Sequence, residues 1–573
     1  MKKKIIRRRL AQHDSVTSDL HPLLKRIYPT RGISSHHELE RGLEHLLPYE
    51  NMLGIDKAVH CLAQALQQQK KILIVGDFDA DGATSSALAV RALKSFGAKD
   101  VAFLVPNRFT FGYGLTPELV EVAKELNPAV IVTVDNGIAN HAGVMAAKEF
   151  GMQVVITDHH LPGDTLPLAD AIVNPNQPND TFPSKVIAGV GVIFYVMLAL
   201  RRHLCETGWF ATENIPEPNM SRLLDLVALG TVADVVPLDH NNRILVHQGL
   251  RRIRAGHCVP GISALLEIAN RNPERLVAAD LGFAIAPRLN AAGRLDDMSL
   301  GIECLLTNDI EYARQITQQL NQLNDERRVI EQDMQEQALH ALNLLPAQQD
   351  QSLHGICLFD ETWHQGVIGI LASRIKDRFH RPVIAFAPFT DTELKGSARS
   401  IAGIHIRDVL ADIAARCPDM IAKFGGHAMA AGLTIPSHAL TVFSKMFNDA
   451  ITEKITEEHL NHALLTDGEL APKELTLDIA ELLREAGPWG QAFPEPVFDG
   501  VFAILDQRLV GGKHLKMTLT KDDKMLDAIA FNVDLNQWPN YRCEAVNIAY
   551  RMDVNEFRGK RSVQLVVEHL ETV

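Results

Sequence analysis

Short apolar runs alternate with helix-like segments between about residue 70 and residue 175. The runs "KILIVGD", "VAFLV", "AVIVTVD" and "QVVITD" predict strands, and "ATSSALAVRALKSFG" and "PELVEVAKEL" between them have the apolar spacing of helices. Strands that alternate with helices predict a parallel sheet with right-handed crossovers. Ligands bind such sheets at the carboxyl ends of the strands. This part of the chain is therefore predicted to be an α/β domain with its site along one rim of the sheet.

The pattern changes twice further along the chain. Residues 302–345 contain no glycine or proline and keep roughly 3.6-residue apolar spacing, which predicts a long helix. Its polarity favours a bridge between domains over a self-contained hairpin. "GICLFD", "VIGILASRIKDRF" and "PVIAFA" then predict the strand, helix and strand of a second α/β domain, and from residue 465 short alternating strands with Gly and Asp turns predict a small β-barrel. The expected parts are an N-terminal segment (1–50), a catalytic domain (51–301), the connecting helix (302–345), a smaller α/β domain (346–455) and the barrel (465–573).

Composition and charge exclude several classes of protein. With 46% hydrophobic and 22% charged residues the chain has the make-up of an ordinary globular protein, and no apolar run approaches the roughly 20 residues of a membrane span. The seven cysteines are scattered and form no CxxC motif, so neither a zinc motif nor a disulfide framework is expected. A net charge of −13 argues against a generally basic nucleic-acid coat, although a local basic groove remains compatible with it. We expect a monomeric cytoplasmic protein without a membrane partner, whose basic residues 2–9 form a tail rather than a DNA contact.

Acidic and imidazole side chains directly follow three of the predicted strands, and one more acid ends the apolar helix-like run "LLDLVALGTVADVVPL". These residues are Asp77, Asp79 and Asp81 after "ILIV", Asp135 after "AVIVTV", Asp158, His159 and His160 after "QVVIT", and Asp234. Parallel pairing would gather them on one rim. Carboxylates and imidazoles without cysteine suit Mn²⁺ or Mg²⁺, and two such ions about 3.5–4 Å apart would neutralise the acids and could cut phosphodiesters.

A structural explanation competes with this hypothesis. A lone aspartate after a strand is more often a helix cap or turn residue, and Asp77 and Asp158 fit that role most readily. A lone histidine is likewise more often packed or solvated than bound to metal. Three successive strands that all end in ligand-type residues favour the metal site over this explanation.

The motifs that carry these residues resemble a known family. "GDFDADGATS", "VTVDNGI", "TDHHLPG" and "GTVADVVPL" look like the four ordered motifs of the DHH phosphoesterase superfamily. "APRLNAAGR", "WHQGVIGILASR", "GSARS" and "KFGGHAMAAG" are similar to its single-strand-specific 5′→3′ DNA exonucleases, and the likeness runs from about residue 50 to the C-terminus. The first motif departs from the superfamily pattern, because Val75 stands where a histidine is usual and Asp77 is extra. The resemblance implies a DHH catalytic domain, a DHHA1 accessory domain and an OB-fold, in that order.

The resemblance also implies roles for the residues of the predicted rim. It implies two Mn²⁺ or Mg²⁺ ions, with Asp135 as a catalytic bridge between them; the metal ligands are Asp79, Asp81, Asp135, His159 and Asp234, with Asp77 as a further candidate. His160 would then face the scissile phosphate and donate a hydrogen bond or a proton to the leaving oxygen. The alternative is that His160 only orients His159. A water shared by the two ions would attack phosphorus in line, and 5′-mononucleotides would be the products.

Further candidates for DNA contacts lie outside the rim. Ser397 and Arg399 in "KGSARS" offer phosphate donors, and Gly425 and Gly426 predict a tight turn with His427 beside it, before a helix-like run. The resemblance adds Arg108 as a third grip on a terminal 5′ phosphate. Arg288 and Arg294 are candidates for backbone contacts, although surface salt bridges explain many such arginines. In the barrel the candidates, which could equally be solvated hairpin tips, are Lys513, Lys516, Phe557, Arg558 and Lys560.

The function that we predict is a single-stranded-DNA-specific 5′→3′ exonuclease of recombination and DNA repair. The resemblance suggests single-strand-binding protein and the RecQ helicase as partners. One alternative is a DHH phosphodiesterase that acts on pyrophosphate, short oligonucleotides or cyclic dinucleotides, whose shorter chains generally lack the terminal barrel. Another is a non-catalytic single-strand-binding replication scaffold, which the complete set of ligand positions disfavours.

Overall fold

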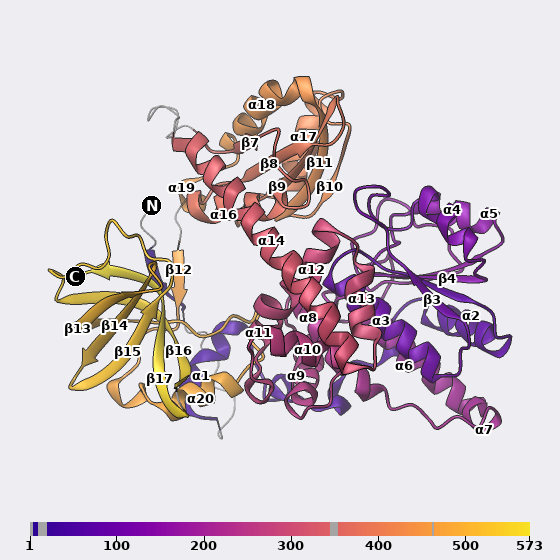
Figure 1. Cartoon of the computed structure of the whole chain (residues 1–573), viewed down its shortest axis with the longest axis horizontal. Coiled ribbons are helices and arrows are strands. Elements are labelled where there is room, and N and C mark those ends of the chain that lie inside the picture. Colours follow the sequence, from indigo (N-terminus) through magenta and orange to yellow (C-terminus); the bar gives the residue numbers. More distant parts are fainter. Residues whose placement is uncertain (1–3, 10–19, 344–352, 461–462, 558) are drawn as a thin grey trace. The chain divides into compact units, whose positions relative to one another are not determined.

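The structure is a computed structural model that describes residues 4–9, 20–343, 353–460, 463–557 and 559–573 (Figure 1). The chain divides into two compact units. The large unit contains residues 7–324 and 466–573, and the small unit contains residues 325–465 with the residues before Arg7. None of the described helices combines the length and the apolarity that crossing a membrane requires.

A five-stranded parallel sheet in the order β3-β2-β4-β5-β6 forms the centre of the first domain of the large unit. Its strands are β2 (Ile72–Val75), β3 (Val101–Leu104), β4 (Val130–Val134), β5 (Gln153–Thr157) and β6 (Ala171–Val173). Ile72 and Ile74 join one buried core, and Leu73 and Val75 join another on the opposite face. Helices cover both faces, which is why β2 is an uninterrupted apolar run and β4 is apolar except for Thr133. The helices are α2 (Ile55–Gln67), α3 (Ala80–Ser95) and α6 (Gly189–Glu206) on one side, and α4 (Pro117–Glu125) and α5 (His141–Glu149) on the other.

A helical layer follows the sheet in sequence. It contains α7 (Trp209–Thr212), α8 (Leu224–Ala233), α9 (His240–Arg254), α10 (Pro260–Ile268), α11 (Ala278–Asp280), the π-helical turn η7 (Leu281–Ile285), α12 (Ala286–Leu295) and α13 (Ser299–Leu306). The prediction of one helix over 302–345 is wrong at its start: residues 302–306 end α13, and α14 begins only at Ile310. Thr307 is extended, and the Asp309 side chain accepts the backbone N–H of Glu311 at 2.9 Å as a new helix cap. The second helix, α14 (Ile310–Asn343), belongs to both units, as expected of a connecting helix.

The small unit is built on a five-stranded mixed sheet in the order β10-β11-β9-β8-β7. Its elements are β7 (Ile356–Phe359), α16 (Ile368–Phe379), β8 (Val383–Pro388), β9 (Glu393–Arg399), α17 (Ile406–Arg416), β10 (Lys423–Gly426), β11 (Ala430–Pro436), α18 (Leu440–Thr452) and α19 (Glu457–Leu460). The prediction of a helix after Gly425 and Gly426 is wrong, and the tight turn lies at residues 427–429, directly after the glycines and not at them. Both glycines lie in β10, and the supposed helix is β11, because pairing with β9 along its whole length overrides the local turn signal.

A closed barrel in the order β13-β14-β15-β17-β16 completes the large unit. Its strands are β13 (Phe498–Val510), β14 (His514–Lys521), β15 (Lys524–Ala530), β16 (Ala545–Phe557) and β17 (Lys560–Thr572). The predicted barrel is confirmed, but its strands begin at Phe498 rather than near residue 465. The connection before it contains α20 (Leu477–Glu485). One buried core extends from the α/β domain into the barrel, so the two are packed together within the large unit.

The described part of the basic start, residues 4–9, contains a paired strand, contrary to the expected tail. Residues Lys4–Arg7 form β1, which pairs with β12 (Ala463–Thr466). Arg7 donates to the Asp499 carboxylate at 2.7 Å. After α1 (Pro22–Ile27), the fully buried guanidinium of Arg31 forms a bidentate pair with Asp467 at 2.7 and 2.9 Å. Because these cations already have acidic partners within the protein, they serve to hold the segment to the region before the barrel.

Candidate metal centre

The loops that follow β2, β4 and β5, together with the end of α8, bring the predicted residues into one centre. Ligand atoms lie within 4.8 Å of one another in three overlapping groups, which are Asp77 with Asp79 and Asp135, Asp81 with His159 and Asp234, and Asp135 with His159 and His160. Nε2 of His159 lies 3.1 Å from Asp135 and 3.4 Å from Asp234. The predicted convergence on one rim is therefore present in the structure.

The first loop combines helix capping with a place in this centre. Oδ1 of Asp79 accepts the N–H groups of Asp81 and Gly82, both at 3.0 Å, and so caps α3. The Asp81 carboxylate accepts the N–H groups of Gly189 and Val190, at 2.7 and 3.0 Å, at the start of α6. A side chain at Gly82 would collide with the backbone of Asp77, so the loop can close this tightly only with glycine at that position.

Asp135 and Asp158 are held by unusual backbone and hydrogen-bond geometry. Asp135 has φ 61°, in the left-handed region that few residues other than glycine adopt, and such outliers cluster at functional sites. The buried carboxylate of Asp158 accepts the N–H of Ile138 at 2.9 Å and that of His159 at 2.7 Å, and it lies 2.7 Å from Nδ1 of His160. Asp158 therefore stabilises the turn after β5 and orients His160, in line with the turn role that the sequence suggested for it.

The carboxylates of the centre repel one another strongly in the absence of a cation. Burial and the nearby Asp79 raise the pKa of Asp77 to about 8 and that of Asp81 to about 7, and burial with neighbouring acids raises the pKa of Asp135 and Asp234 well above the ordinary value. No donor among the described residues satisfies the buried Oδ1 of Asp77. An oxygen-rich donor set with one or two imidazoles and an orphaned buried oxygen fits hard divalent ions such as Mn²⁺ or Mg²⁺.

Asp158 and His160, the first and third residues of the Asp158-His159-His160 sequence, have opposite pKa shifts. Burial alone would raise the pKa of Asp158, but the imidazoles of His160 and His159 outweigh it and lower this pKa to about 2. Burial alone would lower the pKa of His160, but Asp158 and the surrounding acids raise it to about 10. In the metal-free protein this pKa makes His160 a cation at neutral pH, beside the carboxylate centre.

Two residues near the centre were not found from the sequence. The hydroxyl of Tyr113 donates to the backbone oxygen of Asp135 at 3.2 Å and lies 3.3 Å from Nδ1 of His160. Oδ1 of Asn290, on α12, accepts the N–H of Ala80 at 2.8 Å and so ties α12 to the first loop. A signal was nevertheless present in the sequence. Tyr113 stands in the same motif as Arg108, "PNRFTFGYG", and Asn290 stands in the same motif as Arg288, "APRLNAAGR".

The predicted arginines of the large unit differ in their surroundings. The guanidinium of Arg108 lies 4.0 Å above the ring of Phe78, where Asp77 is its main electrostatic partner. Arg288 is buried, and it donates to the side chain of Asn321 at 3.0 Å and to the backbone oxygen of Ala284. Arg294 is half-buried at the end of α12. Arg108 therefore lies at the centre, whereas Arg288 is engaged in packing α12 against α14.

In the small unit the predicted phosphate-binding residues Ser397, Arg399 and Gly425 lie on neighbouring strands of one sheet. Nη1 of Arg399 donates to Oγ of Ser397 at 3.1 Å, both on β9. Ser397 pairs in register with Gly432 of β11, which in turn pairs with Gly425 of β10, and the space above both glycines is open. A Cβ at Gly369, beside the start of α16, would lie 2.9 Å from Arg399 and 3.0 Å from Ser397. The Ser397 hydroxyl and the Arg399 guanidinium thus lie on the same sheet as the backbone at Gly425 and Gly432, which no side chain covers.

The remaining candidates lie at the edges of the strands. Gly426 ends β10, and His427 is exposed in the hairpin that follows. In the barrel, Lys513 and Lys560 are exposed, and Lys516 lies 3.7 Å from Asp527 across the strands. The side chain of Phe557 and the whole of Arg558 lie outside the described residues.

Comparisons with known proteins agree with the order of an α/β domain, a smaller α/β domain and a barrel along the chain. A model of the DHH family N-terminal domain matches residues 71–231, one of the DHHA1 domain matches 351–453, and one of the RecJ OB domain matches 466–569. The single-stranded-DNA-specific exonuclease RecJ of Dickeya dadantii (strain 3937) is 57% identical over 99% of this chain and 98% of its own length. That of Escherichia coli (strain K12) is 53% identical over 98% of each chain. The chain belongs to the RecJ family.

Solved RecJ structures have the same fold. The structure of RecJ in complex with Mn²⁺ from Thermus thermophilus superposes with a TM-score of 0.78 at 30% identity, covering 97% of this chain and 76% of that one. The Mg²⁺ complex of RecJ from the same organism gives 0.74 at 27% identity, with coverage of 97% and 75%. The predicted DHH, DHHA1 and OB-fold architecture of a RecJ family member is therefore confirmed.

Proposed function

We propose that this protein is a single-stranded-DNA-specific exonuclease that hydrolyses phosphodiester bonds from the 5′ end and releases 5′-mononucleotides, with two Mn²⁺ or Mg²⁺ ions. The observation that carries the proposal is the convergence of five aspartates and two histidines from separate loops into one buried centre, in a chain of the RecJ family. A non-catalytic scaffold would not need so many buried, mutually repelling carboxylates.

The overlapping groups of ligand atoms suggest how two ions would be held. Asp77, Asp79 and Asp135 would hold one ion, Asp81, His159 and Asp234 would hold the other, and Asp135 could bridge them because it also lies close to His159. Bound in this way, the two ions would supply an activated water and neutralise the charge of the phosphate. The hydroxyl of Tyr113 holds the backbone of Asp135 in position, and the N–H of Gly189 at the start of α6 holds the carboxylate of Asp81.

His160 is proposed as the residue that donates a hydrogen bond or a proton to the leaving oxygen. Its imidazole is held by Asp158 at 2.7 Å and by Tyr113 at 3.3 Å, and Asp158 keeps it protonated. The rings of His160 and His159 lie 4.5 Å apart, and Asp158 is 2.7 Å from Nδ1 of His160. This arrangement favours direct action on substrate over a role limited to orienting His159.

The surface made by Ser397, Arg399 and the glycines of β10 and β11 is proposed to bind the terminal 5′ phosphate. An arginine fork and a hydroxyl beside open backbone are suited to a phosphate dianion. Arg108 is proposed as a further phosphate contact beside the carboxylates. The exposed lysines of the barrel would track the DNA backbone of longer substrates. From the resemblance alone we also propose action as a cytoplasmic monomer, with single-strand-binding protein and RecQ helicase as partners.

Digestion of a long single strand tests the proposal against its alternatives. The strand is labelled at its 5′ end and offered with and without a 5′ phosphate, with Mn²⁺ or with EDTA. Early release of the 5′ label as a mononucleotide, followed by progressive shortening of the stained strand, is the expected result, and both are abolished by EDTA and by Asp135→Ala. The matched control is Asp164→Ala, which removes an exposed carboxylate from the loop after the histidine pair.

Two other results would contradict the proposal. Tight binding of the strand without cleavage would favour the scaffold. Cleavage restricted to short oligonucleotides or cyclic dinucleotides would favour the other phosphodiesterases.

A further inference from the structure

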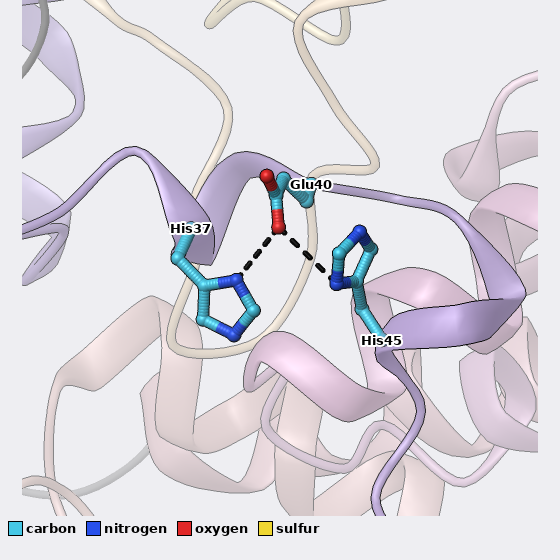
Figure 2. A group of neighbouring side chains, drawn as sticks. All are labelled: His37, Glu40 and His45. Carbon is cyan, nitrogen blue, oxygen red and sulfur yellow. Dashed lines mark hydrogen bonds and ion pairs between the residues drawn. The ribbon is translucent and has the colours of Figure 1, made fainter.

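A second group of metal-type side chains lies in the N-terminal segment, none of whose described residues belongs to the ligand groups of the carboxylate centre. Figure 2 shows His37, Glu40 and His45 pointing toward one another from two short 3₁₀-helices, η2 (His37–Leu39) and η3 (Leu43–His45), and the residue after η2. Nδ1 of His37 lies 2.6 Å and Nδ1 of His45 lies 3.2 Å from the same carboxylate oxygen, Oε2 of Glu40. One donor atom from each residue lies within 4.8 Å of the others.

A carboxylate lies near each ring nitrogen of His45, with Glu40 at 3.2 Å from Nδ1 and Glu44 at 3.6 Å from Nε2. With a metal ion bound at Nδ1, the ring would carry its N–H on Nε2, on the side of Glu44. A carboxylate that receives the second N–H of a histidine is the usual partner of a metal-bound imidazole.

The backbone around the group is fixed by α9. Nε2 of His240 bonds the backbone oxygen of Glu40 at 2.8 Å, Nη2 of Arg243 donates to that of Glu38 at 2.9 Å, and Gln248 donates to that of Arg41. Three successive turns of one helix thus hold the carbonyls on both sides of Glu40. The histidines and the glutamate are therefore brought together before any ion binds, which lowers the entropy cost of binding.

We propose that His37, Glu40 and His45 bind one Zn²⁺ ion, which closes the η2–η3 segment against α9 as a structural clamp. Two imidazoles and one carboxylate suit Zn²⁺, whereas Mg²⁺ prefers an all-oxygen set. Zn–ligand bonds of about 2.0–2.1 Å at tetrahedral angles place ligands roughly 3.3 Å apart, close to the 3.2 Å between His45 and Glu40. The His37–Glu40 contact has to open slightly, and water completes the coordination of these partly exposed side chains.

Equilibrium dialysis of the full chain against Zn²⁺ tests the site. Saturating Mg²⁺ in both chambers occupies the carboxylate centre, and elemental analysis gives the zinc bound per chain. The double variant His37→Gln/His45→Gln is expected to bind one Zn²⁺ fewer than the wild type. His60→Gln, which removes an exposed histidine of α2 outside the group, is the matched control and keeps the wild-type number. Equal zinc in the wild type and the double variant overturns the proposal.

A second variant keeps the test decisive if the double variant folds poorly. Glu44→Gln leaves all three ligands in place and removes only the acceptor for His45. Its Zn²⁺ affinity is expected to fall about 10- to 100-fold. Substitution of Co²⁺ for Zn²⁺ should give a tetrahedral visible absorption band in the wild type and in Asp135→Ala. An affinity unchanged in Glu44→Gln, or a band lost in Asp135→Ala, contradicts a separate site at these residues.

Discussion

Replacing Gly189 by alanine adds a single methyl group behind the proposed bridging carboxylate. The new Cβ would lie 2.6 Å from Cβ and 2.9 Å from Cα of Asp135, and neither contact can be relieved by rotating the Asp135 side chain, because the backbone fixes both atoms. Carbon atoms settle at roughly 3.5–4.0 Å, so one of the two segments must move by roughly 1 Å. A misplacement of roughly 1 Å can cost about 10²-fold in rate. That factor corresponds to about 2.7 kcal/mol of transition-state stabilisation.

The expected result is a kcat about 10²-fold lower, measured at saturating Mn²⁺ on the 5′-labelled single strand, with weaker Mn²⁺ binding by calorimetry. Gly163→Ala is the control, because a Cβ at that exposed position has no neighbour closer than 4.0 Å. A Gly189→Ala enzyme with kcat and Mn²⁺ affinity within twofold of wild type would refute the close packing of α6 on the centre.

Four further outcomes are expected. His160→Ala should lower kcat by about 10²–10⁴-fold with unchanged Mn²⁺ stoichiometry by calorimetry, and loss of metal would instead assign the residue to ligand orientation. Arg399→Lys keeps the charge but loses the fork, and should reduce the preference for a phosphorylated over a hydroxyl 5′ end by about tenfold in competition digests; an unchanged ratio would exclude the contact. Because the pKa values of Asp77 and Asp81 are raised to about 8 and about 7, the metal-free folded protein holds protons that the unfolded chain has lost, and its free energy of unfolding falls as pH rises from about 4 to 8. Mn²⁺ should therefore raise Tm more at pH 8 than at pH 6 in scanning calorimetry, and equal increments would count against these shifts. Lys513→Ala should flatten the slope of log K against log salt for single-strand binding by about 0.7 in fluorescence anisotropy, and an identical slope would show that this lysine touches no phosphate.

The strands of the parallel sheet and the residues at their ends could be predicted from the sequence because both signals are local. A strand buried on both faces reads as a short apolar run, and the rim of a parallel sheet collects whatever follows each run. The cap of α14 at Asp309 was also local, in the letters "TND", but the even apolar spacing on either side concealed it.

Other features depend on contacts between distant segments, for which the sequence has no local pattern. Asn290 reaches Ala80 across 210 residues, and Gly432 joins the row from Ser397 to Gly425 only through strand register. The glycines of β10 misled the prediction for the same reason, since a pair of glycines favours a turn until neighbouring strands impose an extended conformation.

The pairing of Arg31 with Asp467 and of Arg7 with Asp499 links residues 436 and 492 positions apart. At roughly 5–20 residues per second, a ribosome supplies the acidic partner of Arg7 roughly 25–100 s after Arg7 itself. A buried guanidinium without its carboxylate is strongly unfavourable, so the first segment made cannot dock until the barrel region has emerged. A nascent chain that stalls before residue 467 would therefore present an undocked N-terminal segment to chaperones and proteases.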